Sequence, residues 1–134
     1  MEPNETVILL AEDDAAVRNL VALMLLKEGY AVLAANDGQE ALDICRQFKE
    51  PIHLLLTDKT MPRMTGVELA EQVLRKRSEI KILIMSGETP DAVLNQNIPD
   101  AFLPKPFMPS TLLKCVKRLL DSEFKGVCYE SDLL

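Results

Sequence analysis

Acidic side chains gather at two points of the sequence, and each point follows a short apolar run. Glu12 and Asp13 come directly after the run over residues 7–11, and Asp58 follows the run over residues 52–57. If these runs are neighbouring parallel strands, their carboxyl ends meet at one edge of a sheet, so the three carboxylates share a cleft. Carboxylates held so close repel one another, and a hard divalent cation relieves that repulsion. The pattern therefore predicts a site for Mg²⁺, with Mn²⁺ as an alternative ion.

A cation in this cleft permits chemistry that a bare acidic cleft forbids. Once the charge is neutralised, an anionic phosphoryl group can approach a carboxylate, which can attack phosphorus and form an acyl phosphate. Asp58 is the best candidate nucleophile, because it stands alone at the end of its apolar run. Ser86 and Lys105 follow later runs, and they can bind phosphoryl oxygens through a hydroxyl and an ammonium group.

Alternating strand and helix patterns run through the chain and must position these residues. Short continuous apolar runs predict buried strands over residues 7–11, 30–35, 52–57, 81–85 and 101–103. Apolar residues at helical spacing predict helices around residues 17–25, 41–48, 67–74, 91–97 and 112–120. Asp14 and Asp37 are expected to begin helices, Gly29 to end one, and Thr65 with Glu68 to form a capping box.

Five strands separated by helices predict an α/β fold with a doubly wound parallel sheet and helices on both faces. A strand order of 2-1-3-4-5 would place the acidic residues at the switch point of that sheet. Residues 1–121 are expected to form one domain. Residues 122–134 show no clear period, and they are expected to be a C-terminal tail or linker stub.

The composition excludes several classes of protein. The 134 residues carry a net charge of −6, and an acidic chain lacks the basic face of a general nucleic-acid or anionic-membrane binder. The longest apolar run, residues 20–26, is far shorter than the roughly 18 residues needed to span a bilayer. Three cysteines without C-x-x-C spacing, Cys45, Cys115 and Cys128, are expected as buried reduced thiols of a cytoplasmic protein. The lone His53 is expected to be structural.

Four stretches together resemble the receiver domain of bacterial response regulators, which has a flavodoxin-like sheet. These stretches are residues 9–14, 55–66, 84–87 and 102–107, and the resemblance covers about residues 5–121. The phrases Leu-Leu-Thr-Asp at 55–58 and Met-Ser-Gly at 85–87 are most similar to receivers attached to hybrid sensor histidine kinases. The resemblance implies a cytoplasmic signalling module that catalyses its own phosphotransfer and dephosphorylation, and no other enzyme activity.

The resemblance assigns roles around the acidic cleft. Asp58 matches the residue that accepts a phosphoryl group from a sensor histidine kinase or a phosphotransfer domain. Glu12 and Asp13 match the acid pair that holds Mg²⁺, and the main-chain carbonyl of Thr60 matches a further metal ligand. Glu12 departs from the family pattern, in which Asp is commoner, so its longer side chain is expected to reach the metal through water.

The resemblance also implies a conformational switch. Ser86 matches a hydroxyl that turns toward the phosphoryl group, and Phe102 matches an aromatic residue that follows it into the vacated space. Lys105 matches an invariant lysine, and the Lys105–Pro106 bond is expected to be cis. The downstream effector is unknown from the sequence, and a homodimer is compatible with the family.

Three other functions compete with a phosphorylated receiver. The leading alternative is a receiver-like interaction module that works without phosphorylation. An aspartyl phosphohydrolase would place its nucleophile after the first strand in a D-x-D pattern, which Glu12-Asp13-Asp14 lacks. A flavodoxin-like electron carrier would need a phosphate-binding loop that is missing here.

Overall fold

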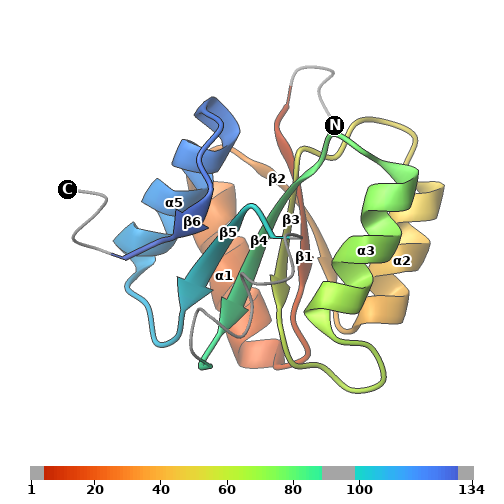
Figure 1. Cartoon of the computed structure of the whole chain (residues 1–134), viewed down its shortest axis with the longest axis horizontal. Coiled ribbons are helices and arrows are strands. Elements are labelled where there is room, and N and C mark those ends of the chain that lie inside the picture. The colour runs from red at the N-terminus through yellow and green to blue at the C-terminus, as the bar shows by residue number, and fades with distance from the viewer. Residues whose placement is uncertain (1–4, 89–98, 130–134) are drawn as a thin grey trace.

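The computed structural model of the chain describes residues 5–88 and 99–129, which form a parallel sheet covered by helices on both faces (Figure 1). The strands are β1 (Val7–Ala11), β2 (Ala31–Ala35), β3 (Leu54–Asp58), β4 (Lys81–Ser86), β5 (Ala101–Pro104) and β6 (Gly126–Val127). The helices are α1 (Ala15–Lys27), α2 (Gly38–Gln47), α3 (Gly66–Lys76) and α5 (Pro109–Asp121). The sheet order is β2-β1-β3-β4-β5-β6, which confirms the order predicted for the first five strands. The helix expected at 91–97 lies outside the described residues.

The central strands are buried on both sides because each side of the sheet carries its own apolar core. Leu9 and Leu55 pack with residues of α2 and α3 on one face. Leu10 and Leu56 pack with residues of α1 and α5 on the other face. Figure 1 shows these two pairs of helices on opposite sides of the sheet. A strand flanked by two cores reads as a continuous apolar run, which is why the runs predicted strands.

The expected helix ends are present. Asp14 caps α1 by accepting hydrogen bonds from the N–H groups of Ala16 and Val17, at 2.9 and 3.2 Å. Thr65 and Glu68 form the reciprocal capping box at the start of α3. Asp37 accepts from the N–H of Glu40 at 2.8 Å. Gly29 follows α1 with a φ of +95°, a conformation that favours glycine.

Some boundaries differ from the prediction. β3 begins two residues later than expected and ends on Asp58, so this residue belongs to the strand. Leu20, expected on the buried stripe of α1, is 58% exposed, because α1 faces the sheet through Val21 and Leu25. His53 is structural as expected, since its Nδ1 accepts a hydrogen bond from the N–H of Val7 at 3.0 Å. No helix in the described part of the chain has the length and apolar composition to cross a membrane.

Part of the segment after Asp121, expected to be a C-terminal tail or linker stub, joins the sheet. Gly126 and Val127 form a sixth strand that pairs in parallel with Ala101 and Phe102 of β5. Gly126 has a φ of +143°, which lets the chain turn into this pairing. The added strand satisfies main-chain groups that an edge strand would otherwise leave open. Two residues are too few to show a strand period in the sequence.

The expectation of reduced thiols is wrong for two of the three cysteines. Cys115 of α5 and Cys128, which follows β6, form a disulfide with their Cα atoms 5.9 Å apart. Both side chains are buried in the core shared by α1 and α5. Cys45 is buried and free, as expected. Cys128 enters the core only because β6 joins the sheet, so the pairing depends on the strand that the sequence did not reveal.

Candidate functional site

The structure brings the three predicted carboxylates together at the carboxyl edge of the sheet. Ala11 of β1 lies beside Thr57 of β3, so the residues that follow them are neighbours. Carboxylate oxygens of Glu12, Asp13 and Asp58 all lie within 4.8 Å of one another. Glu12 is buried, Asp58 is partly buried and Asp13 is exposed, so the cluster opens to solvent on the side of Asp13.

Lys105 reaches this cluster from the loop that follows β5. Its Nζ lies 3.2 Å from Oδ2 of Asp58 and 3.4 Å from Oε1 of Glu12. The N–H of Lys105 donates to the carbonyl oxygen of Ser86 at 2.8 Å, which fixes the start of the loop. The Lys105–Pro106 peptide bond is cis, as expected. Three carboxylates and one ammonium group give the cluster a formal charge of −2, which matches one divalent cation.

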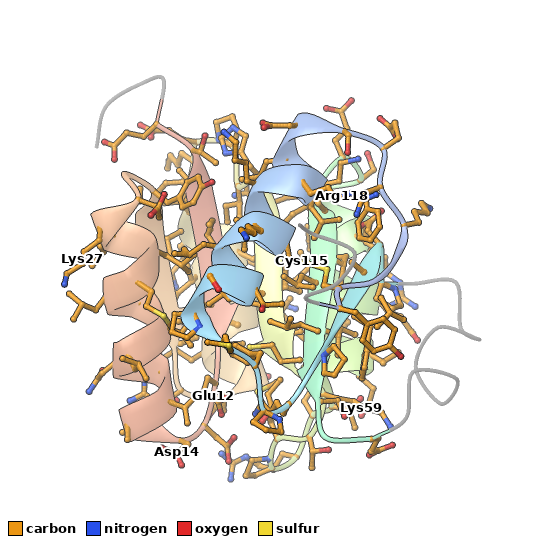
Figure 2. All side chains as sticks on the ribbon, turned by 90° about the vertical axis from the view of Figure 1, so that its left-hand side faces the viewer. Glu12, Asp14, Lys27, Lys59, Cys115 and Arg118 are labelled. Atoms are coloured by element: carbon orange, nitrogen blue, oxygen red, sulfur yellow. A yellow bond between two sulfur atoms is a disulfide. The ribbon has the colours of Figure 1, made fainter. Side chains whose placement is uncertain are left out.

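Glu12 is held from several sides. Its Oε2 accepts a hydrogen bond from the N–H of Asp14 at 3.1 Å, and its carbonyl oxygen accepts one from Arg18 at 2.9 Å. Figure 2 shows Glu12, Asp14 and Lys59 at the same end of the molecule. The carboxylate therefore has a fixed position before any ligand arrives.

Burial and neighbouring charge shift the proton equilibria at this cluster. Burial raises the pKa of Glu12, and the negative charge of Asp58 raises it further, against the lowering effects of the Asp14 N–H and Lys105. Burial lowers the pKa of Lys105, but Asp58 and Glu12 together outweigh it, so the pKa is raised overall. Lys105 thus stays charged at neutral pH, while the buried carboxylate is stabilised by any added positive charge.

Ser86 ends β4 and is buried beside the cluster. Met85 lies opposite Asp58 in the register of β3 and β4, so Ser86 stands one residue beyond Asp58. Its Oγ accepts a hydrogen bond from the N–H of Glu88 at 2.9 Å. The hydroxyl is therefore engaged with its own loop. Because β3 and β4 are adjacent strands, Ser86 nevertheless lies next to the end of β3, where any group attached to Asp58 would be.

The other two predicted site residues, Phe102 and Thr60, lie in β5 and in the loop after β3. Phe102 is completely buried in β5, where it pairs with Ile84 of β4. Its carbonyl oxygen accepts a hydrogen bond from the N–H of Cys128 at 2.8 Å. Thr60 is exposed in the loop after β3. Phe102 can therefore act on the site only through the strands between them.

Two features of the site do not follow from the sequence patterns. A Cβ atom on Gly66 would lie 2.3 Å from the carbonyl oxygen of Asp58, so only glycine fits where the loop folds back on β3. Gly66 stands directly after Thr65 in the sequence, but the capping box of Thr65 and Glu68 already explained this position as the start of a helix. Lys59 and Glu88 form an ion pair between the loops after β3 and β4. Nothing in the sequence relates these two residues, which are 29 positions apart.

A doubly wound parallel sheet with an acidic cluster and a lysine at its carboxyl edge defines a class of phosphoryl-accepting signalling folds. The family model for the response regulator receiver domain matches residues 8–117, and the chain belongs to this family. The resemblance seen in the sequence is thereby confirmed.

Individual relatives agree with this assignment. The chain is 35% identical over 117 residues to response regulator RR06 of Streptococcus pneumoniae, covering 84% of this chain and 52% of that protein. It is 34% identical over 119 residues to the sensor kinase CckA of Brucella abortus, covering 87% of this chain and 13% of the kinase. The chain thus spans about half the length of the first relative and much less of the second.

Solved structures share the fold over nearly their whole length. The chemotaxis protein CheY4 of Vibrio cholerae superposes with a TM-score of 0.79 at 31% identity, covering 87% of this chain and 99% of that one. The receiver domain of the hybrid histidine kinase CckA gives a TM-score of 0.73 at 35% identity, covering 85% and 98%. The acidic cluster is consistent with a phosphorylation site that uses a metal ion.

Proposed function

We propose that Asp58 accepts a phosphoryl group from a phosphohistidine of a sensor histidine kinase or a phosphotransfer domain. An oxygen of Asp58 forms the new bond to phosphorus, the phosphorus–nitrogen bond breaks, and the histidine nitrogen keeps the electron pair. The observation that carries the proposal is the contact of the Lys105 ammonium group with both Asp58 and Glu12 in a cluster of net charge −2. Such transfer depends mainly on positioning and charge neutralisation.

The donor set fits Mg²⁺, which prefers a few hard carboxylate oxygens and keeps several waters. Glu12, Asp13 and Asp58 would hold the ion, with the main-chain carbonyl of Thr60 as a further ligand, and Mn²⁺ would fit the same oxygens. The ion, when bound, neutralises charge on the cluster and on the phosphoryl oxygens. Lys105 contributes a positive charge 3.2 Å from Oδ2 of Asp58 and would orient this carboxylate for attack.

The switch follows from the present contacts of Ser86. A phosphoryl group on Asp58 offers its hydroxyl a charged acceptor, which is a stronger partner than a neutral one. Turning toward it, Ser86 gives up its bond to the N–H of Glu88, so the loop after β4 is released. Phe102 then moves into the vacated space and alters the outer face around β5 and α5.

The proposal extends to the setting of the domain. The receiver domain would comprise residues 1–121 and would catalyse its own phosphotransfer and dephosphorylation. Its phosphorylated form would bind a downstream protein, which could be a second copy of this chain. Its phosphoryl group comes ultimately from ATP bound by a kinase, which favours a place in the cytoplasm.

The test is incubation of the 134-residue chain with a small phosphodonor and Mg²⁺, read by intact mass. We expect one phosphoryl adduct on the wild type and none on Asp58→Asn. Asp14→Asn is the matched control, since Asn caps a helix as well as Asp and this side chain is outside the cluster. An adduct that survives in Asp58→Asn refutes the role of Asp58. No adduct on the wild type favours the phosphorylation-independent interaction module.

A further inference from the structure

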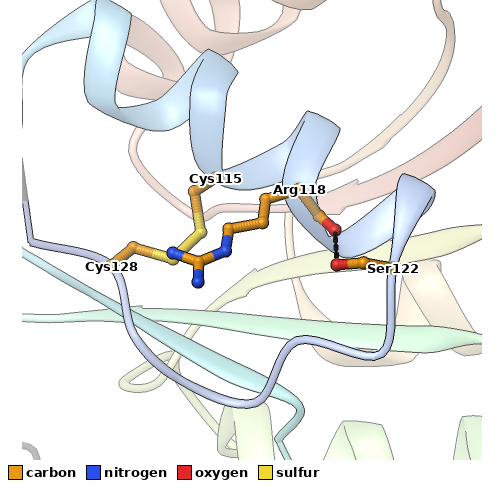
Figure 3. Close-up of a disulfide and its surroundings, with 4 residues drawn as sticks. All are labelled: Cys115, Arg118, Ser122 and Cys128. Carbon is orange, nitrogen blue, oxygen red and sulfur yellow. Dashed lines mark hydrogen bonds between the residues drawn. A yellow bond between two sulfur atoms is a disulfide. The ribbon is translucent and has the colours of Figure 1, made fainter. Parts of the chain in front are cut away.

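The segment of residues 122–129, called the C-terminal segment below, covers the outer edge of the sheet. It leaves α5 after Asp121, runs back along the sheet, and pairs with β5 through β6 (Figure 1). Figure 3 shows the disulfide that ties its end to α5, one turn before Arg118. The segment therefore forms a covalently closed loop over the edge of β5.

Besides the disulfide, the segment pairs with β5, packs Val127 and Phe124 against the two cores, and donates the Ser122 hydroxyl to the carbonyl oxygen of Arg118 at 2.7 Å. Its N–H groups at Gly126 and Cys128 donate to the carbonyl oxygens of Asp100 and Phe102, at 3.0 and 2.8 Å. Its side chains add the ion pairs Lys125–Asp100 and Lys81–Glu123, at 3.9 and 3.6 Å, and a contact of Phe124 with the Arg118 guanidinium at 4.0 Å. Glu123 is 95% exposed and Lys125 is 69% exposed, so these ion pairs contribute little. The disulfide is the covalent link that holds the far end of the segment on α5.

A route to the disulfide exists on the same side. A surface hollow of about 140 Å³ is lined by Cys128 and Tyr129 together with Thr111 and Met108. Of these lining residues, Met108 and Tyr129 are exposed, whereas Cys128 is 1% exposed. Cys115 does not line the hollow and is fully buried. A thiol of a small reagent therefore meets Cys128 first, after a small local opening of the segment.

We propose that Cys115 and Cys128 form a redox-active pair, and that a dithiol reductant opens the C-terminal segment and uncovers the β5 edge. A thiolate of the dithiol attacks Sγ of Cys128, the disulfide breaks, and Cys115 leaves as a thiolate that takes a proton. The second thiol of the reagent then displaces Cys128 and closes a cyclic disulfide, so two electrons and two protons pass to the protein. A disulfide oxidant of the glutathione class reverses the exchange and closes the segment again.

Opening of the C-terminal segment would leave β5 without its partner strand β6. The carbonyl oxygens of Asp100 and Phe102 lose their partners, and Phe102 becomes part of an edge strand. Unpaired edge strands are the usual sites of further strand pairing. The redox step needs no phosphoryl group on Asp58, so this inference stands independently of the proposed function.

The experiment compares amide hydrogen exchange at Gly126 and Cys128 in the oxidised protein and after dithiothreitol treatment, with thiol alkylation reporting the redox state. We expect both amides to exchange at least about tenfold faster after reduction, while Leu55 in β3 changes little. Cys128→Ser should show the faster Gly126 exchange without reductant. Cys45→Ala is the control, because it retains the disulfide and should respond to reductant as the wild type does.

Two outcomes would overturn the inference. One is full alkylation of Cys115 and Cys128 even after equilibration with oxidised glutathione, which would show that the pair does not close. The other is equal exchange at Gly126 in the oxidised and reduced wild type. The second outcome is readable even if Cys128→Ser fails to fold, because it uses the wild-type chain alone.

Discussion

Glu12 is the buried carboxylate of the acidic cluster, and burial raises its pKa. Its carboxylate is buried, faces Asp58, and is compensated by one main-chain N–H and one lysine. A bound proton or a bound divalent cation would each neutralise the negative charge of this carboxylate, so the two compete for the same group. The stability of the metal-free protein should therefore depend on pH through this side chain.

We expect Glu12→Gln to raise the thermal midpoint at pH 7 in the absence of divalent ions. The folded-state pKa of Glu12 lies above the ordinary 4.5, so the folded protein binds this proton more tightly than the unfolded chain does. The resulting stability is fully present below about pH 4.5 and is lost as pH rises through the folded pKa. The advantage of Glu12→Gln should thus shrink toward pH 4.5.

Thermal melts with a chelator between pH 4 and pH 7 measure this effect, and each 1 kcal/mol corresponds to about 4 °C. The raised pKa of Lys105 does not interfere, because its stabilising charge is lost only above the ordinary 10.5. A Glu12→Gln protein that is less stable than the wild type at pH 7 would contradict the assigned cost of burying this carboxylate.

Asp13 offers a separate test of the metal site. It is the exposed member of the cluster, so replacing it disturbs the fold least. We expect Asp13→Asn to weaken Mg²⁺ binding at least about tenfold in a calorimetric titration at neutral pH. Asp14→Asn, one residue further along, should bind the ion as the wild type does. An unchanged titration of Asp13→Asn would remove this residue from the site.

The loop between β3 and α3 shows how elements position the nucleophile. Gly66 N–H donates to the carbonyl oxygen of Lys59 at 2.7 Å, so the loop closes back on the end of β3. The capping box of Thr65 and Glu68 then starts α3 immediately. Asp58 is thus fixed by a strand before it and a closed turn after it.

We expect Gly66→Ala to destabilise the protein by about 1–3 kcal/mol, as overpacking does. Helix propensity alone would favour Ala at the start of α3, but its Cβ would meet the carbonyl oxygen of Asp58 at 2.3 Å. Gly87→Ala is the matched control, because a Cβ there meets no atom within 4 Å, and it should change stability by less than about 0.5 kcal/mol. Urea denaturation measures both, and equal stabilities of the two variants would rule out the close approach.

The sequence predicted most of these elements because their causes are local or repeated. Two-sided burial makes β1 and β3 continuous apolar runs, and caps such as Asp14 lie next to the helices they begin. The acidic cluster followed because parallel strands end at a common edge. β6 and the Cys115–Cys128 bond could not be predicted, since they depend on tertiary pairing of a two-residue strand. The exposure of Leu20 likewise depends on how α1 is rotated against the sheet.

At the scale of the whole molecule, the sheet separates two cores, and the disulfide joins elements of only one of them. Cys115 and Cys128 belong to the core of α1 and α5, while Cys45 belongs to the core of α2 and α3. A covalent link of this kind acts mainly by restricting the unfolded chain. It should therefore raise global stability, whichever side of the sheet unfolds first.

We expect reduction of the disulfide to lower the free energy of unfolding by about 3 kcal/mol, the effect of closing a loop of roughly 15 residues. The two cysteines are 13 residues apart in sequence. Denaturant titrations with and without dithiothreitol measure the difference, and Cys45→Ala should show the same difference from a lower baseline. Identical curves for the oxidised and reduced wild type would contradict this expectation.

The link between α5 and the end of β6 also sets how far the chain can be drawn out under a pulling force. Fully extended backbone spans at most about 3.5 Å per residue, so the sequence separation of 13 between Cys115 and Cys128 amounts to roughly 45 Å of contour length. While the sulfur bridge is intact, that length is hidden from any force applied at the two ends of the polypeptide. Reduction of the disulfide would release this length, so the maximum extension of the pulled chain depends on the redox state of the two cysteines.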